Sequence, residues 1–152
     1  MLKLFVASSK EARTQAKEFI KGCSKDNLEY IPWWDKFVAG RTLLEELDNI
    51  SKDVHGAVII LTPEGVATNN KGTQIVIPNL NVLFEFGYFY SKFGKNNVLV
   101  AKYGKVNLPT DLGGYIHAFG SDYFKPNAKV PVSKRTLKEF DKWYDPFITS
   151  GR

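Results

Sequence analysis

The run of residues 56–61, Gly-Ala-Val-Ile-Ile-Leu, constrains the fold more than any other stretch of this chain. It contains no polar side chain, and Thr62-Pro63 ends it. An uninterrupted aliphatic strand of this kind is typical of a central parallel strand that is covered on both faces. The chain must therefore supply helices for both sides of a sheet.

Strand-like and helix-like segments alternate along the rest of the chain. Patterns typical of strands cover residues 3–7, 27–34, 97–101 and 115–119, and patterns typical of helices cover 10–21, 42–50, 79–90 and 133–147. This alternation predicts an α/β fold, a flavodoxin-like three-layer sandwich with a central, mostly parallel five-stranded sheet.

Local signals refine this prediction. Pro32 places the 27–34 strand at a sheet edge or at a bulge, and Thr42 with Glu45 forms a capping-box pattern. Residues 35–40, 64–78 and 103–114 are expected to be loops. Asp145-Pro146 should end or kink the last helix.

Length and composition bound the class of protein. At 152 residues, the chain is expected to form one domain, 1–152. One cysteine excludes an intrachain disulfide, and no apolar run approaches the roughly 20 residues needed to span a bilayer. The net charge of +5 comes from scattered lysines without a nucleic-acid motif. We therefore expect a cytoplasmic protein that binds neither nucleic acid nor membrane.

The helix predicted over residues 79–90 contains a carboxylate in unusual surroundings. Glu85 lies among apolar and aromatic residues, where an ionised group is rarely placed without a partner. Asn81 and Tyr88 share its helix face by their spacing. These three residues form a candidate site. The alternative is a solvent-facing glutamate favoured by the helix dipole.

Further candidates follow from the predicted sheet. Ligands of such folds bind outside the carboxyl ends of the strands, which places Ser8-Ser9, Trp34-Asp35 and Thr62 on one rim near the start of the 79–90 helix. The chain has no Gly-x-Gly-x-x-Gly fingerprint and no Walker loop, and neither His55 nor His117 has metal-ligand spacing. We therefore expect no metal and no bound cofactor.

A carboxylate beside an aromatic-rich cleft suits chemistry at a sugar C1′ atom. Cleavage of an N-glycosidic bond passes through an oxocarbenium-like state, as in O-glycoside hydrolysis. A carboxylate such as Glu85 can stabilise that cation, hold ribose hydroxyls or attack C1′.

With these residues assembled, the chain resembles the TIR-like domains of bacterial anti-phage effectors, the predicted nucleotide-binding TIR proteins that include STING–TIR fusions. The matching pieces follow the order of the family over about residues 3–119: Leu4-Phe5-Val6-Ala7-Ser8-Ser9, Trp34-Asp35-x-Phe37-x-x-Gly40-x-Thr42-Leu43-x-Glu45, Ala57-Val58-Ile59-Ile60-Leu61-Thr62-Pro63, Asn81-Val82-Leu83-Phe84-Glu85-Phe86-Gly87, and Leu108-Pro109-x-Asp111-Leu112-x-Gly114. Residues 133–148 then form a C-terminal helical extension.

The resemblance implies an NAD⁺ glycohydrolase activated by oligomerisation, with NAD⁺ as substrate. It implies Glu85 as the catalytic residue and a substrate site that includes Ser8, Ser9, Asp35 and Asn81. Asp111 lies in a shared motif, where a structural turn is as good an interpretation as ligand contact. The 35–42 loop would mediate self-association, and a cyclic-nucleotide sensor domain or protein would be a partner.

Two other functions fit the same residues. Nucleoside 2-deoxyribosyltransferases share the fold class and use a helix-borne glutamate that attacks C1′. A non-catalytic TIR scaffold would instead recruit partners, with exposed apolar residues of the 36–42 loop such as Phe37 as its main surface.

Overall fold

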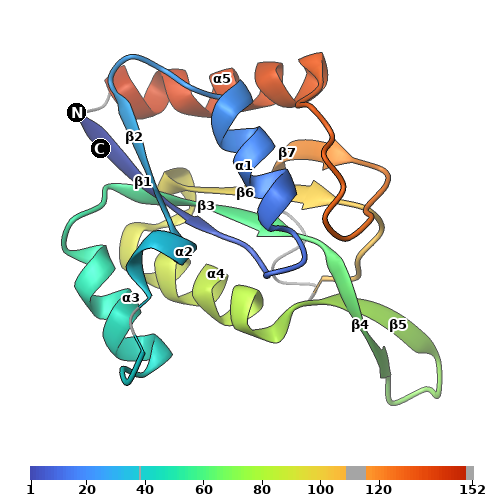
Figure 1. The fold of residues 1–152 in the computed structure, drawn as a ribbon. Coiled ribbons are helices and arrows are strands. Elements are labelled where there is room, and N and C mark those ends of the chain that lie inside the picture. The colour runs from blue at the N-terminus through green and yellow to red at the C-terminus, as the bar shows by residue number, and fades with distance from the viewer. Residues whose placement is uncertain (38, 109–115, 150–152) are drawn as a thin grey trace.

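The computed structural model describes residues 1–37, 39–108 and 116–149, and it contains the predicted five-stranded sheet (Figure 1). The strands are β1 (Leu2–Ala7), β2 (Leu28–Pro32), β3 (Gly56–Leu61), β6 (Val98–Tyr103) and β7 (Ile116–Ser121). Their order in the sheet is β2-β1-β3-β6-β7, and each neighbouring pair is parallel. The flavodoxin-like α/β prediction is confirmed.

Helices cover both faces of this sheet, as Figure 1 shows. On one face lie α1 (Arg13–Gly22) and α5 (Lys134–Thr149), and on the other lie α3 (Leu43–Ser51) and α4 (Leu80–Phe93). The short elements are α2 (Trp33–Lys36), directly after β2, and the 3₁₀ turn η1 (Lys95–Asn97) before β6. The result is a three-layer sandwich.

The central strand β3 divides the hydrophobic core into two halves. All six of its residues are buried. Because side chains alternate along a strand, Val58 and Ile60 join the core under α1 and α5, whereas Ile59 packs in the core that includes Phe86 and Phe89 of α4. The aliphatic run thus specifies a strand with helices on both sides.

Pro32 marks the end of the edge strand β2. Its position at the sheet edge confirms the prediction drawn from the proline. The sequence predicts that this strand continues to Trp34 and that a loop begins at Asp35. Both predictions are wrong, because residues 33–36 form the single helical turn α2. The Phe37 N–H closes this turn on the Trp33 carbonyl oxygen at 3.2 Å. Proline has no N–H group, so it is tolerated both at the start of a helix and on an edge strand, where that N–H would have no backbone partner.

The long loop predicted over residues 64–78 is wrong. These residues form a hairpin of β4 (Pro63–Thr68) and β5 (Gln74–Pro78), which projects beyond the end of the main sheet (Figure 1). The turn is organised by Asn69, whose side chain accepts hydrogen bonds from the N–H groups of Lys71 and Thr73 at 3.0 and 2.9 Å. An asparagine that bonds nearby backbone groups is a common turn device.

The helix predicted around Glu85 is confirmed and has clear caps at both ends. The Asn79 side chain accepts from the N–H groups of Asn81 and Val82, which satisfies free donors of the first turn. Gly94 ends the helix at φ +80°, a conformation that favours glycine. These caps fix the length and register of α4.

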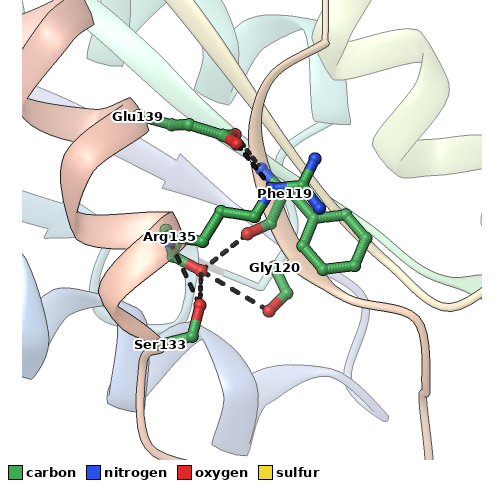
Figure 2. A network of polar contacts seen from close by, with 6 residues as sticks. Phe119, Gly120, Ser133, Arg135 and Glu139 are labelled. Atoms are coloured by element: carbon green, nitrogen blue, oxygen red, sulfur yellow. Dashed lines mark hydrogen bonds and ion pairs between the residues drawn. The ribbon is translucent and has the colours of Figure 1, made fainter.

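The edge strand β7 is tied to α5 by the polar network of Figure 2. Thr136, fully buried, donates its hydroxyl to the Phe119 carbonyl oxygen at 2.6 Å. Glu139 accepts from the Phe119 N–H at 2.6 Å and from the Arg135 Nε at 2.9 Å. The network fixes the outer flank of the sheet against this helix.

The sequence predicts that the last helix ends or kinks at Pro146. The prediction that it ends there is wrong. Helix α5 includes Pro146 and continues to Thr149. Its buried face, which includes Phe140, Trp143 and Phe147, packs into the core. We infer that this packing offsets the backbone hydrogen bond that proline removes.

The capping box of α3 allows a direct test of local stability. The Thr42 hydroxyl accepts from the Glu45 N–H at 3.2 Å, and the Glu45 carboxylate accepts from the Thr42 N–H at 3.0 Å. Thr42→Ala should lower the free energy of unfolding by about 1 kcal/mol, whereas Thr42→Ser keeps the hydroxyl and should lower it much less. Urea unfolding measures both, and equal losses would contradict the capping role.

Candidate active site

Glu85 lies on the buried side of α4, on the same helix face as Val82 and Phe89. Only 3% of its surface is exposed. Within the described part of the chain, its Oε2 atom has no hydrogen-bond partner. The structure therefore excludes the solvent-facing alternative and leaves a buried carboxylate.

Burial alone raises the pKa of Glu85 to about 8. Among the described residues, no positive charge contributes to this shift, and α4 packs on the apolar strands β1 and β3. A carboxylate kept out of water without a partner is unfavourable for folding. Such groups are more frequent at functional sites than elsewhere, so Glu85 is the centre of the candidate site.

The carboxyl ends of β1 and β3 contribute a set of buried hydroxyl groups. Ser8, Ser9 and Thr62 are 6%, 4% and 1% exposed. Ser8 Oγ accepts from the indole Nε1 of Trp33 at 2.8 Å, and Ser9 Oγ accepts from the Ala12 N–H at 3.1 Å. These contacts hold the hydroxyls at the rim on which the sequence placed them.

Glu64 belongs to this rim, although the sequence analysis did not single it out. Its carboxylate accepts a hydrogen bond from the Thr62 hydroxyl. Burial raises the pKa of Glu64, the hydroxyls of Ser9 and Thr62 act in the opposite direction, and Glu11 raises it further. Its position directly after the central strand and Thr62-Pro63 could have identified it as a residue of this rim. It was missed because residues 64–78 were predicted to be a loop.

An open groove of about 710 Å³ lies at this edge of the sheet. It is lined by the base of the hairpin, the start of α4 and a segment near Phe124: Glu11, Pro63, Glu64, Gly65, Ile77, Pro78, Asn79, Leu80, Asn81, Phe124 and Pro126. Asn81 is exposed here, one helical turn before Glu85. The structure thus brings Asn81, Thr62 and the two serines to one end of the sheet.

The remaining candidates lie elsewhere. Trp34 packs with the core of α1 and α5, on the opposite face of the sheet from Glu85, and the Arg13 guanidinium lies 5.0 Å from its ring centroid. Asp35 is exposed on α2. The Tyr88 hydroxyl donates to the Asp48 carboxylate on α3 and lies 3.3 Å from the Ser51 hydroxyl. Asp111 lies outside the described residues.

Phe37, the apolar residue named in the predicted self-association segment 35–42, is not fully exposed. Phe37 is half-buried, and its ring centroid lies 6.2 Å from those of both Phe5 and Trp33. The expectation that Phe37 offers an exposed docking surface is wrong, because its ring extends the core under α4. Val38 lies outside the described residues.

In the ranges that the structure describes, no three His, Cys, Asp or Glu side chains come close enough together to hold a metal ion. None of the helices in these ranges combines the length and apolar character that crossing a membrane requires.

Comparison with known protein families gives one match that covers more than half of the chain. The model of the TIR domain of CAP12/Pycsar effector proteins matches residues 3–119. This span contains Glu85 and the carboxyl ends of β1, β2, β3 and β6, and it ends within β7, before α5.

Curated relatives agree with this match. The chain is 30% identical over 112 residues to CD-NTase-associated protein 12 of Sphingobacterium faecium, covering 74% of this chain and 34% of that protein. It is 31% identical over 116 residues to the Pycsar effector protein BcPycTIR of Burkholderia cepacia, covering 74% and 38%. An uncharacterized Escherichia coli protein, YuaY, is 34% identical over 96 residues, covering 62% and 32%. The chain thus spans about a third of the length of these relatives.

Proposed function

The chain belongs to the family of CAP12/Pycsar effector TIR domains, the TIR-like domains of bacterial anti-phage effectors, and from this premise we propose that it cleaves the nicotinamide–ribose bond of NAD⁺ with Glu85 as the catalytic carboxylate. The observation that carries the proposal is the burial of Glu85 without a hydrogen-bond partner for Oε2 among the described residues. A cationic ligand would supply the missing partner.

The chemistry requires charge stabilisation more than proton transfer. When the bond from C1′ to the pyridinium nitrogen breaks, its electron pair moves to the nitrogen, and nicotinamide leaves as a neutral molecule. Positive charge then develops on the ribose, as in glycoside hydrolysis. Water adds at C1′ and loses a proton, which gives ADP-ribose. An ionised Glu85 in a site of low polarity would stabilise the developing cation strongly.

The raised pKa of Glu85 fits this role. In the ligand-free protein, a pKa of about 8 keeps much of the carboxyl group protonated at neutral pH. A nearby opposite charge lowers the pKa of a carboxyl group, so the positively charged nicotinamide ring would favour the ionised form. Ionisation would thus accompany substrate binding.

The rim offers groups that suit the rest of the substrate. We assign Ser8, Ser9, Thr62 and Asn81 to contacts with ribose hydroxyls and the pyrophosphate, since hydroxyl and amide groups form hydrogen bonds with both. Glu64 joins them as an acceptor for ribose hydroxyl groups. Tyr88, whose hydroxyl donates to Asp48, would act mainly by fixing α4 against α3.

We further propose that assembly switches the enzyme on. Names of the relatives refer to CD-NTase association and to Pycsar effectors, and this chain covers only about a third of their length. A cyclic-nucleotide sensor, as a further domain or a separate protein, would then bring several TIR domains together. Contacts through the 35–42 segment would place the groups around Glu85 in their active arrangement.

Nicotinamide release tests the proposal. The chain would be fused to coiled coils of defined oligomeric state and incubated with NAD⁺, with the unfused chain as the comparison. We expect turnover in an oligomeric fusion and little in the monomer. Base exchange between deoxynucleosides with NAD⁺ left intact would indicate a deoxyribosyltransferase-like enzyme instead. Assembly without turnover of either substrate would indicate a scaffold.

A further inference from the structure

A second groove, of about 800 Å³, lies on the flank of the sheet where β6 and β7 meet α5. Its wall on α5 is formed by Arg135, Glu139, Lys142, Trp143 and Pro146, which follow helical spacing along one side. The opposite wall comes from β6, β7 and the residues after them: Lys102, Gly104, Lys105, Phe119 and Asp122. The core beneath this flank is that of α1 and α5, whereas Glu85 lies under α4 on the other face.

Most of the charged side chains that line this groove are basic. Four cationic residues line it, Lys102, Lys105, Arg135 and Lys142, against the carboxylates of Asp122 and Glu139. Glu139 is already engaged, because its two oxygens accept from the Arg135 Nε at 2.9 Å and from the Phe119 N–H at 2.6 Å. The three lysines form no ion pair with the described residues. The groove therefore has an excess of positive charge.

Arg135 is held in place before any ligand arrives. Its Nε is fixed by Glu139, and the guanidinium carbon lies 4.1 Å from the centroid of the Phe119 ring. Figure 2 shows the two terminal nitrogens of Arg135 without a hydrogen bond to the residues drawn. A guanidinium group with its Nε anchored and its terminal N–H groups available matches the oxygens of a phosphate.

The groove also has an apolar component. Trp143 lines it, and its indole Nε1 donates to the Asn96 carbonyl oxygen at 3.1 Å, which fixes the ring. Trp143 is only 7% exposed and the Phe119 ring, on the opposite wall, lies under the Arg135 guanidinium, so these rings support the basic groups. The basic groups themselves suit the phosphate groups of a small molecule such as a nucleotide.

We propose that this groove is a second ligand site, which binds the phosphate groups of a nucleotide through Arg135, Lys142, Lys102 and Lys105. The site is separate from Glu85 and does not depend on the activity proposed there. Because α5 lies beyond the residues matched by the family model, the site belongs partly to the C-terminal extension of this chain.

Calorimetric titration with ADP and with inorganic pyrophosphate tests the proposal in matched variants. Lys142→Glu reverses a charge in the groove, and Lys138→Glu makes the same change on an exposed part of α5 outside it. Lys142→Glu should weaken binding at least about tenfold, the effect of losing one charge-assisted hydrogen bond. Lys138→Glu should change it far less.

A second pair of variants separates this groove from the site around Glu85. Arg135→Gln should also weaken binding of pyrophosphate, whereas Asn81→Ala, which removes a group assigned to the pyrophosphate at the other site, should leave binding in the groove unchanged. Circular dichroism would verify that each variant is folded. No binding of either probe to the wild type at millimolar concentration would overturn the proposal. Equal losses in Lys142→Glu and Lys138→Glu would overturn it as well, since they would indicate general charge attraction.

Discussion

Glu85→Gln should lower NAD⁺ cleavage by the oligomeric fusion at least about 10²-fold, with a much smaller change in KM. The substitution keeps the size of the side chain and removes its negative charge. If Glu85 stabilises charge that develops on the ribose, most of the loss appears in kcat, because its interaction with the ribose is stronger in the transition state than in the bound substrate. Nicotinamide release under saturating NAD⁺ measures it.

Glu46 provides a matched control for this substitution. It is a second buried glutamate, 4% exposed, and it lies on α3 with the Arg41 guanidinium 3.5 Å from its Oε1 atom. Glu46→Gln removes a buried carboxylate from the same domain, so it reports any general effect of such a change on folding. We expect it to retain most of the activity. Activity in Glu85→Gln equal to that of Glu46→Gln would exclude Glu85 as the catalytic residue.

The stability of the protein should depend on pH through Glu85. The folded-state pKa of about 8 lies above the ordinary value of 4.5, so the folded state holds this proton more tightly than the unfolded state does. Below pH 4.5 both states are protonated, and Glu85 has no effect. As the pH rises from about 5 to 8, the unfolded state loses the proton first, and stability falls by at most about 1.4 kcal/mol per pH unit.

Glu85→Gln removes this titration and should therefore stabilise the protein at higher pH. We expect a gain of up to about 4 kcal/mol near pH 8, which shrinks towards zero near pH 5. Urea unfolding of wild type and variant at several pH values measures the difference, in which the contributions of other titrating groups, such as Glu64, cancel. A difference that does not change with pH would show that Glu85 titrates normally in the folded state.

Together, these two predictions describe a carboxylate that functions at the expense of stability. A group that is unfavourable for folding and necessary for activity is common at active sites. The loss of activity and the gain of stability should occur in the same variant, which no purely structural role for Glu85 explains.

The parts of the fold that depend on local patterns were predictable from the sequence. The aliphatic run 56–61 specified a buried central strand, and the Thr42–Glu45 spacing specified a capping box. The apolar pattern of residues 79–90 specified the helix that contains Glu85, which the structure extends to Phe93. Each of these signals acts within a few residues, through side-chain periodicity or through hydrogen bonds to neighbouring backbone groups.

The elements that were missed depend on contacts beyond their own segment. The β4–β5 hairpin was hidden because its residues are rich in Gly, Asn and Thr, and only the pairing of the two strands identifies it. Helix α2 is a single turn, too short for periodicity. Pro146 would end an isolated helix, but the packing of Phe140, Trp143 and Phe147 against the core allows α5 to continue.

The sequence by itself determined that this chain forms a parallel α/β sandwich and that one carboxylate lies on an otherwise apolar helix. Only the tertiary structure decided that this carboxylate is buried and that its Oε2 atom has no hydrogen-bond partner among the described residues, since both depend on the elements that surround Glu85. In the same way, it added Glu64 to the rim and placed Trp34 on the opposite face of the sheet. Helix spacing specifies which residues share a face, whereas the packing of other elements decides which of them meet water, one another or a ligand.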